Sequence, residues 1–508
     1  MSLAFVYTRS SIGIEAPLII VEAHISKGLP GFTLVGLPDA PAKGARDRVR
    51  SALLNNGFDF PARRITVNLA PADLPKEGGR YDLPIALAVL AASRQIPPHS
   101  LSGLEFLGEL ALSGEIRPVQ GIIPAALEAK RAQRSLVLPE HNGPEAMLVA
   151  ESQVWLAASL RDVCRFLQGA SQLPAAADCA APPPEPDEAD LRDIIGQHQA
   201  KRALEIAAAG GHNLLLLGPP GTGKTMLAGR LPGILPPLSD DEAIETAAVA
   251  SLLGQDNARR YWRRRPFRTP HHSATPAALI GGGAWPRPGE ASLAHNGVLF
   301  LDELPEFQRG VLDALREPLE TGEINISRAQ VKVAYPARFQ LLGAMNPSPT
   351  GDVQGVHSRG GPQQALRYLN RLSGPFLDRF DMSVEVPLLP PGLLGRTSTD
   401  GESSSAVRER VRQAREIQWH RCRKINAHLT NRELAVHCRL EETDALFLEG
   451  VMEKLGLSAR AWHRTLKVAR TLADLAGESG IQRCHLSEAV SYRSMDRLLQ
   501  QLWRQLEQ

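Results

Sequence analysis

A glycine-rich octapeptide, GPPGTGKT, follows the apolar run NLLLL and precedes the helical pattern MLAGRL. This order predicts a strand, a tight loop and a helix. Glycines let backbone N–H groups close around phosphate oxygens, Lys224 supplies a cation for the β- and γ-phosphates, and the Thr225 hydroxyl is a ligand for Mg²⁺. A chance glycine-rich turn is the alternative. The predicted cofactors are ATP and Mg²⁺, and the predicted contacts are Gly218, Pro219, Pro220, Gly221, Thr222, Gly223, Lys224 and Thr225.

A second apolar run, VLFLDEL, predicts a buried strand that ends in two carboxylates, Asp302 and Glu303. We expect Asp302 to orient the magnesium ion through its water shell. Glu303 is expected to align and polarise the water that attacks the γ-phosphate. An acidic pair at a strand end is otherwise a solvated turn, but the phosphate loop upstream favours a catalytic pair.

Two further motifs place a polar side chain where it could contact a bound nucleotide. The strand-like run FQLLGAMNP ends at Asn346, which we expect to contact the γ-phosphate or the attacking water; a turn-initiating role before proline is the alternative. In GPFLDRFD, Arg379 stands among carboxylates. In a ring of ATPases such an arginine can reach the neighbour's nucleotide and stabilise transition-state charge. A local ion pair with Asp378 or Asp381 is the alternative.

These motifs lie on strand-like runs that alternate with helical patterns, which is typical of a parallel sheet buried on both faces. An Ala-, Pro- and acid-rich segment precedes this region, and a polar segment at 396–406 followed by helical patterns comes after it. The sequence therefore predicts an α/β protein with four segments: an N-terminal domain at 1–170, a linker at 171–190, a nucleotide-binding core at 191–395 and a helical lid at 406–508.

Composition limits the partners and the compartment. The 508 residues carry 57 Lys and Arg against 55 Asp and Glu, so nucleic-acid contacts require local clusters of Arg rather than a global basic field. The five cysteines form no CxxC pair, which indicates a reduced compartment. The N-terminus lacks a signal-peptide pattern, and the apolar stretch from Leu83 is about half the length that spans a bilayer. We expect a cytoplasmic protein without membrane contact.

The phosphate loop, the DE strand, the Asn strand, LDRFD and the later LSARAWHRTLKVART together resemble the AAA+ ATPases of the magnesium-chelatase-like family, and the resemblance to its ComM- or YifB-like branch covers the whole chain. It implies a homo-oligomeric ring, a hexamer, with ATP at the subunit interfaces. It implies that Arg460 of LSAR is a second sensor of the γ-phosphate in the lid, with Arg464, one helical turn on, as the fallback. It also places Ile194, Ile195 and Gly196 against the adenine.

Three segments are candidates for contact with nucleic acid. EINISRAQVKVAYP alternates apolar and polar residues and predicts a β-hairpin. The resemblance places such a hairpin at the pore of the ring, where Arg328 and Lys332 can touch a DNA backbone; a solvent-facing tip is the alternative. Two basic clusters, at 261–268 and 407–426, interleave an aromatic with Arg, as single-stranded nucleic-acid sites do, or form ordinary solvated faces.

Metal ligands other than those of magnesium are not expected. Many relatives carry a cysteine cluster after the Asn-Pro strand, but this chain has no cysteine there, so we expect no zinc. His271 and His272 lie in a Gly- and Pro-rich region that resembles the helix-two insert of this ATPase clade. Adjacent histidines seldom face one metal, so we reject a metal site at this pair.

The N-terminal domain resembles the proteolytic domain of Lon in ITVNLAPADLPKEG and FLGELALSGEIRPVQGI. Lon-type proteases use a Ser nucleophile and a Lys base, and the resemblance puts Arg80 at the Ser position and Ile123 at the Lys position. A guanidinium only donates, and Ile123 accepts no proton. We expect a Lon-like α+β fold that has lost the protease chemistry and serves assembly or substrate contact.

The leading hypothesis is a ring-forming ATPase that moves along DNA. The family resemblance adds branch migration, with single-stranded or branched DNA as partner, in natural transformation and recombination. Two rivals are the ATPase motor of magnesium insertion into a porphyrin, in which a Lon-like domain is not expected, and a chaperone-like remodeller of protein substrates. A processive protease is a third rival, and the missing Ser-Lys pair argues against it.

Overall fold

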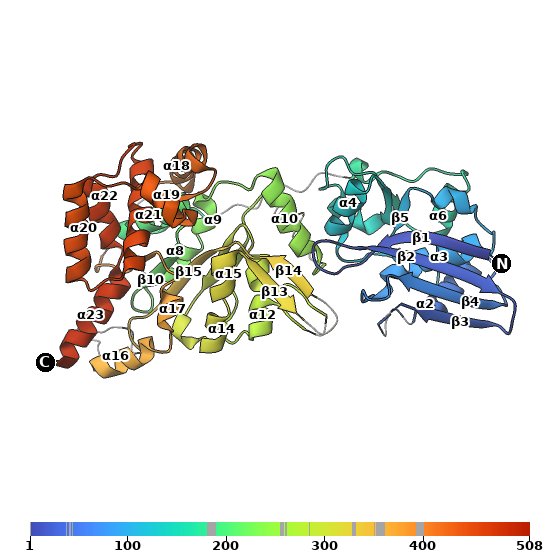
Figure 1. The fold of residues 1–508 in the computed structure, drawn as a ribbon, viewed down its shortest axis with the longest axis horizontal. Helices are drawn as coiled ribbons and strands as arrows, with labels where there is room; N and C mark the ends of the chain where they lie inside the picture. The colour runs from blue at the N-terminus through green and yellow to red at the C-terminus, as the bar shows by residue number, and fades with distance from the viewer. Residues whose placement is uncertain are drawn as a thin grey trace.

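The molecule is elongated, with two bodies joined at a narrow waist and the two termini at opposite far ends (Figure 1). The computed structural model describes residues 2–36, 38–39, 42, 44–179, 189–254, 259, 262–283, 285–327, 332–349, 351, 361–392 and 401–507. Within these ranges, every helix is too short or too polar to span a lipid bilayer.

The N-terminal body is a mixed sheet with helices packed against it. Its strands are β1 (Ser2–Arg9), β2 (Leu18–Ser26), β3 (Gly31–Val35), β4 (Arg64–Ala70), β5 (Leu104–Phe106), β8 (Ser135–Pro139) and β9 (Val154–Ala157), with a small hairpin of β6 (Glu109–Leu110) and β7 (Ile116–Arg117). In the described part of the chain the seven-stranded sheet has the order β3-β4-β2-β1-β5-β8-β9; β2 pairs antiparallel with β1 and β4, and the other pairs are parallel.

Helices of the N-terminal body bury the apolar face of this sheet. They are α2 (Ala45–Asn55), α3 (Asp82–Ala92), α4 (Ile122–Arg131), α5 (Gly143–Ala146) and α6 (Leu160–Leu167). Helix α3 is apolar on every side, and each of its residues is buried because β1 and β2 cover one face and α2 another. Its one acid, Asp82, is fully buried and bonds the Arg48 guanidinium at 2.6 Å.

The central unit is built on a parallel sheet. Its strands are β10 (Leu214–Leu217), β11 (Phe267–Arg268), β12 (Val298–Leu301), β15 (Gln340–Met345) and β16 (Met382–Glu385). Among the described residues the order is β11-β12-β15-β10-β16, and every pair is parallel. Strands β10 and β12 are buried over their whole length, which explains their unbroken apolar runs. All carboxyl ends therefore meet at one edge of the sheet.

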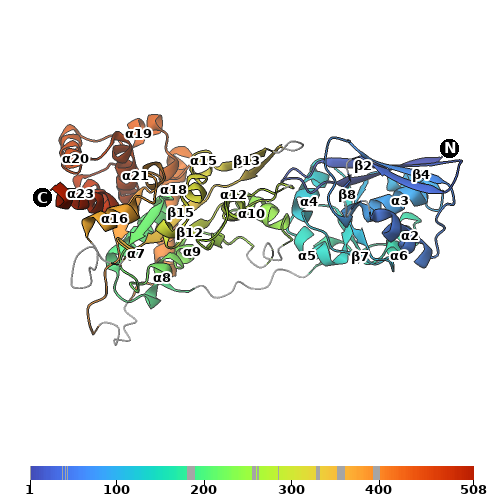
Figure 2. The same ribbon diagram turned by 90° about the horizontal axis from the view of Figure 1, so that it is seen from below.

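Short helices connect and cover these strands. They are α7 (His198–Gly210), α8 (Lys224–Ala228), α9 (Leu231–Ile234), α10 (Asp240–Ser251), α12 (Pro276–Ile280), α13 (Glu290–Leu293), α14 (Arg309–Asp313), α15 (Arg316–Thr321), α16 (Pro362–Leu369) and α17 (Gly374–Leu377). An antiparallel hairpin of β13 (Glu323–Ser327) and β14 (Lys332–Pro336) projects from this unit toward the N-terminal body (Figure 2). Arg328 lies outside the described residues.

The C-terminal unit is helical. It consists of α18 (Ser404–Cys422), α19 (Asn431–His437), α20 (Glu442–Lys454), α21 (Ala459–Leu475), α22 (Arg483–Ser491) and α23 (Ser494–Glu507). Helices α18 and α21 pack on α7, and a buried hydrogen bond of 2.7 Å joins His212 Nε2 to Thr471 Oγ1. Helix α23 returns to pack on α16 and β16. The predicted α/β fold with a parallel core sheet and a helical C-terminal unit is confirmed.

Helix α10 of the central unit joins the two bodies by docking on the start of α4. The Gly121 N–H donates to the Ser251 carbonyl oxygen at 2.8 Å, and the Ile123 N–H donates to Ser251 Oγ at 3.2 Å. Gly121 precedes α4 and has no side chain to cap it, so a serine from the other body caps this helix. A salt bridge of 3.0 Å between Arg287 and Glu77 adds a second contact.

Arg80 lies beside this joint and is only 4% exposed. Its Nη1 donates to the Gln120 carbonyl oxygen at 3.2 Å, but its Nε and Nη2 have no hydrogen-bond partner among the described residues. Burial lowers the pKa of the Arg80 guanidinium, with Tyr81 and Glu77 acting against this shift. A buried cation with two unused donors destabilises the folded state.

We therefore expect Arg80→Met to raise the free energy of unfolding by about 1–3 kcal/mol, because the substitution removes an unsatisfied buried cation. Arg48→Met is the matched control. It leaves the buried Asp82 carboxylate unpaired and should cost about 3–5 kcal/mol. Both are measured by chemical denaturation followed by intrinsic fluorescence. A large loss of stability in Arg80→Met would show that this guanidinium has a stabilising partner.

Candidate nucleotide site

The phosphate loop connects the buried strand β10 to helix α8. Gly221 and Gly223 have φ of 79° and 87°, values that side-chain-bearing residues rarely adopt. A Cβ atom on Gly218 would lie 2.2 Å from the Val386 carbonyl oxygen, so the chain needs glycine there. These three positions curl the backbone so that N–H groups converge at the start of α8.

Lys224, the first residue of α8, folds its ammonium back over the loop. Nζ donates to the carbonyl oxygens of Gly218 and Pro219 at 2.7 and 2.8 Å and to Asn346 Oδ1 at 3.0 Å. Asn346 follows β15, which pairs with β10, so sheet order brings the two side chains together. Burial lowers the pKa of Lys224, while Asp302 and Glu303 act in the opposite direction. Phosphate oxygens carry a formal negative charge and can compete for the same ammonium protons.

The two carboxylates after β12 face the loop from the other side. The Thr225 hydroxyl donates to Asp302 Oδ2 at 2.7 Å, and the Glu303 N–H donates to Asp302 Oδ1 at 2.9 Å. The Asp302 carboxylate is thus held at both oxygens. Hydroxyl and carboxylate oxygens are ligands that Mg²⁺ accepts, so this donor set fits a magnesium ion bound with a nucleotide. Such an ion would neutralise charge on the phosphates.

Glu303 has a left-handed backbone, with φ of 53°, and its side chain is exposed. Strained backbone of this kind is frequent at functional sites. His272 Nδ1 lies 3.5 Å from Glu303 Oε2, a contact that sequence reasoning missed because it treated the histidine pair only as a possible metal site. The imidazole can hold the carboxylate in place.

The segment before α7 reaches the phosphate loop through Gln197, which has a left-handed backbone. Its Nε2 donates to the carbonyl oxygens of Thr222 at 3.3 Å and of Pro387 at 2.8 Å. Ile194 is buried, and Ile195 and Gly196 are half-buried just before this turn. Gln197, a second residue that the sequence did not single out, therefore ties the expected adenine segment to the loop.

A cavity of about 440 Å³ opens beside the phosphate loop, between Gly218 and helix α23. Arg497 of α23 lines it and donates to the Ser491 carbonyl oxygen at 2.7 Å. This lid cation was not predicted, because nothing in the linear sequence places the C-terminal helix next to residue 218.

Arg379 lies at the other edge of the sheet. It comes just before β16, whereas the phosphate loop comes just after β10, and the two strands are parallel neighbours. Its Nη2 pairs with Glu320, and its Nε is buried without a hydrogen-bond partner among the described residues. The alternative to a contact with a neighbour's nucleotide was a local ion pair with Asp378 or Asp381, and the carboxylate that Arg379 contacts is neither of these. Asp381 instead accepts the Asn213 N–H at 3.0 Å and lies 3.8 Å from His212.

Arg460 and Arg464 lie with Arg379 rather than with Lys224 of the same chain. Each has a guanidinium nitrogen 3.8 Å from an Asp378 carboxylate oxygen, and Arg460 is highly exposed. Arg464 also lines a cavity of about 240 Å³ with Arg379. In the described part of this chain, Arg460 thus contacts Asp378 beside Arg379 and not the phosphate loop.

The hairpin candidate Lys332 is exposed on β14 and has no carboxylate partner among the described residues. The neighbouring Val333 is buried and packs close to Gly13 of the N-terminal body. The hairpin thus contacts the N-terminal body with one face and presents Lys332 on the other.

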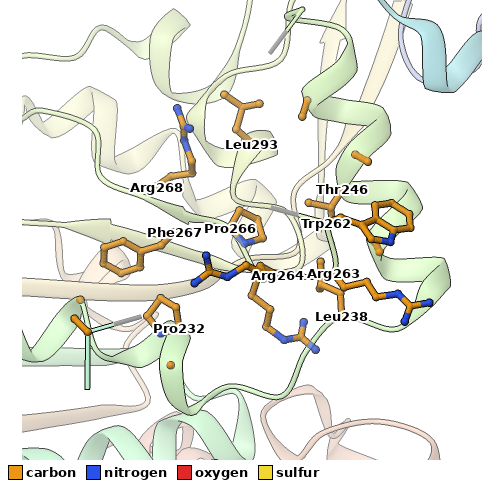
Figure 3. A pocket seen from close by; sticks show the side chains of 17 residues that line it. Pro232, Leu238, Thr246, Trp262, Arg263, Arg264, Pro266, Phe267, Arg268 and Leu293 are labelled. Carbon is orange, nitrogen blue, oxygen red and sulfur yellow. The ribbon is translucent and has the colours of Figure 1, made fainter. Parts of the chain in front are cut away.

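Residues 262–268 of the basic cluster line a cavity of about 430 Å³ against α10, and Figure 3 shows the guanidinium groups of Arg263, Arg264 and Arg268 pointing in different directions. Tyr261, the first residue of the predicted cluster, lies outside the described residues. Three arginines of the cluster are paired with acids: Arg263 with Asp240 at 2.6 Å, Arg265 with Glu242 at 3.2 Å and Arg268 with Glu290 at 2.7 Å. These ion pairs make the cluster a structural element of the insert.

The pair His271 and His272 has ring centroids 4.0 Å apart. In the part of the chain that the structure describes, no group of three or more His, Cys, Asp or Glu residues is arranged to hold a metal. Most of the cysteine-free segment after Asn346 lies outside that part.

A parallel sheet with a phosphate loop after β10, a carboxylate pair after β12, the polar Asn346 after the strand β15 between them and a helical C-terminal unit defines an AAA+ ATPase. The model of magnesium chelatase subunit ChlI matches residues 190–393, that of the subunit ChlI of Mg-chelatase matches 21–142, and that of the ChlI C-terminal region matches 401–493.

Similar proteins cover nearly the whole chain. Competence protein ComM of Haemophilus influenzae is 60% identical over 506 residues, 99% of each chain. The uncharacterized protein YifB of Salmonella typhimurium is 59% identical over 501 residues, 98% of each chain. The magnesium-chelatase 67 kDa subunit of Heliobacterium mobile is 30% identical over 191 residues, 32% of this chain and 28% of its own length. The chain belongs to the ComM- and YifB-like family of magnesium-chelatase-like AAA+ ATPases.

Glu303→Gln tests the carboxylate assignment. Since glutamine keeps the size but cannot act as a base, we expect ATP affinity within about twofold of the wild type and turnover lowered by roughly 10²- to 10⁴-fold. Affinity is measured by isothermal titration with ATP and turnover by phosphate release. Glu306→Gln, which changes an exposed carboxylate paired with Arg371 at 3.2 Å, is the control. Full turnover in Glu303→Gln would exclude Glu303 as the base.

Proposed function

We propose that this protein is a ring-forming, ATP-driven motor that acts on single-stranded or branched DNA, with branch migration in recombination and natural transformation as its activity. Lys224, Thr225 and Asp302 hold ATP with Mg²⁺, and Glu303 activates the attacking water. Arg379 and Arg460 act on the nucleotide of a neighbouring subunit, in a ring that we take to be a hexamer.

The proposal of a ring is supported by the position of Arg379. It lies before β16 while the phosphate loop follows β10, so one chain keeps the two groups at opposite edges of its sheet. A guanidinium with a buried, unused Nε can stabilise phosphate charge only if a second copy brings its phosphate loop to that edge. The cavity that Arg379, Arg464 and Lys467 line at this edge is consistent with such a contact.

The DNA assignment is supported by similarity and by the hairpin. The relative that is 60% identical over 99% of this chain is named a competence protein. The exposed Lys332 on β14 offers a cation to a phosphate backbone. The N-terminal body serves assembly or substrate contact rather than proteolysis, because Arg80, at the position expected for the nucleophile, is buried and can only donate.

Mixing two inactive variants tests the shared site. Lys224→Ala lacks the phosphate-loop lysine that binds ATP in its own subunit. Arg379→Ala lacks the arginine that acts on the nucleotide of the neighbouring subunit. Random mixing in equal amounts pairs an intact loop with an intact Arg379 at about a quarter of the interfaces. We therefore expect the mixture to hydrolyse ATP although neither variant does so alone. A mixture as inactive as its parts would place Arg379 outside the neighbour's site.

Strand displacement from a labelled three-stranded junction tests the DNA motor. We expect displacement by the wild type with ATP, and none without ATP or in Lys224→Ala, because translocation requires phosphate binding by this lysine. An ATPase rate that is indifferent to DNA, without displacement, would contradict the proposal. Stimulation by a porphyrin would then favour a chelatase-type motor, and stimulation by unfolded peptides a remodeller of proteins.

A further inference from the structure

A groove of about 390 Å³ runs between helix α18 of the lid and the strand-entry edge of the central sheet. We call it the α18 groove. Its basic lining comes from both units, and an exposed indole and a phenyl ring complete it. The residues concerned are Arg265, Arg338, Arg415, Arg423, Lys424, Trp419 and Phe339. Its volume falls in the range of about 300–1,000 Å³ that ligand sites occupy.

The charge in this groove is not neutralised by its own acids. Glu242 is paired with Arg265 at 3.2 Å, and the other acid of the lining, Glu245, is paired with His295 at 3.0 Å. Arg338 and Arg423 are exposed, and neither forms an ion pair with a carboxylate among the described residues, although Glu245 interacts electrostatically with Arg338. The groove therefore presents positive charge in a protein whose net charge is only +2.

Arg415 adds a third cation without an acid. Its guanidinium donates twice to the Ala208 carbonyl oxygen, at 2.9 and 2.6 Å, and in the described part of the chain no carboxylate is paired with it. Burial is the main cause that lowers the pKa of Arg415 to about 9; the neighbouring Arg265 adds to this shift, and Glu242 acts against it. An anion in the groove would relieve this repulsion.

The groove wall on the α18 side is built by three residues. Arg415 and Trp419 lie four residues apart on one face of the helix, and Arg423, the C-cap residue with a left-handed backbone, lines the groove just beyond the helix end. Trp419 is 52% exposed, a large apolar surface for a residue between two cations. Arg338 lies on the opposite wall, just after β14. Cations on both walls around an exposed aromatic ring suit a nucleic-acid strand: the ring stacks a base, and the cations hold phosphates.

Other basic residues of the same helix are already engaged. Arg410 is paired with Glu205 at 2.6 Å, Arg412 with Glu409 at 2.7 Å, and Arg421 with Asp474. The structure thus separates the arginines of the 407–426 cluster that are paired with carboxylates from Arg415 and Arg423, which line the groove.

We propose that the α18 groove binds single-stranded DNA, with one base stacked on Trp419 and phosphates on Arg338, Arg415 and Arg423. The proposal rests on the proposed DNA motor and adds a contact outside the pore hairpin. An acidic peptide would satisfy the cations but would leave the exposed indole without a planar partner, so the observations favour a nucleic acid.

The test measures binding of a fluorescent oligodeoxythymidylate to the full-length protein by anisotropy, over a range of salt concentrations. The double variant Arg338→Ala/Arg423→Ala removes two phosphate contacts. The slope of log affinity against log salt, which is negative, should therefore become shallower by about 1.4 for single-stranded DNA. Trp419→Leu should lower the affinity roughly tenfold with little change in the slope. Arg412→Ala on the same helix and Trp503→Leu, an exposed indole on α23, should change the affinity less than twofold.

Two further measurements distinguish the ways in which the proposal could fail. The DNA-free ATPase rate and ATP-dependent assembly, followed by light scattering, should match the wild type in the groove variants. Loss of assembly would overturn the proposal and indicate that the groove is a subunit interface. Unchanged DNA affinity in the variants, with a wild type that binds DNA, would overturn the groove alone. A wild type that binds no single-stranded DNA but displaces a strand from the junction would overturn the groove proposal alone, and one that does neither would overturn both the groove and the DNA motor.

Discussion

Strands β10 and β16 are parallel neighbours, and this arrangement fixes Lys224 and Arg379 at opposite edges of one sheet. Four residues of β10 separate the edges, roughly 13 Å at 3.3 Å per residue. No rotation of a side chain bridges that distance. If hydrolysis uses both groups, it requires two copies of the chain, and the rate of ATP turnover then reports on assembly as well as on nucleotide binding.

The helical unit is tied to the same edge as Arg379 by buried polar contacts. Thr471 Oγ1 bonds His212 at 2.7 Å and Asn426 Nδ2 at 3.0 Å, and Asn426 also donates to Asp474 at 2.8 Å. Such a network holds α21 against the loop between α7 and β10. Helix α23 meanwhile brings Arg497 to the edge that carries the phosphate loop. The helical unit therefore contacts the sheet both at the phosphate loop and beside Arg379. A change in the angle of this unit alters the surroundings of both groups together.

The sequence predicts the part of the site whose chemistry is local. The phosphate loop and the Asp302–Glu303 pair are contiguous motifs at strand ends, and a parallel sheet brings strand ends together. Partners of the charged groups could not be predicted in this way, because Arg379 pairs with Glu320 and Arg263 with Asp240, each on a separate element. The Ser251 cap on α4 could not be predicted for the same reason, because a capping residue from another body is far away in the sequence.

The α18 groove and the Arg379 edge form one continuous surface, because Gly211, Phe339 and His428 line both cavities. A DNA strand in the groove would lie next to Arg379 and Arg464, on the side where we propose that a neighbour's nucleotide binds. Its phosphates would add negative charge beside Arg379 and Arg464, and thermodynamic linkage requires that ATP at the interface then changes DNA affinity by the same factor as DNA changes ATP affinity. The fold thus offers a short electrostatic route between the two ligands, without a long chain of conformational changes.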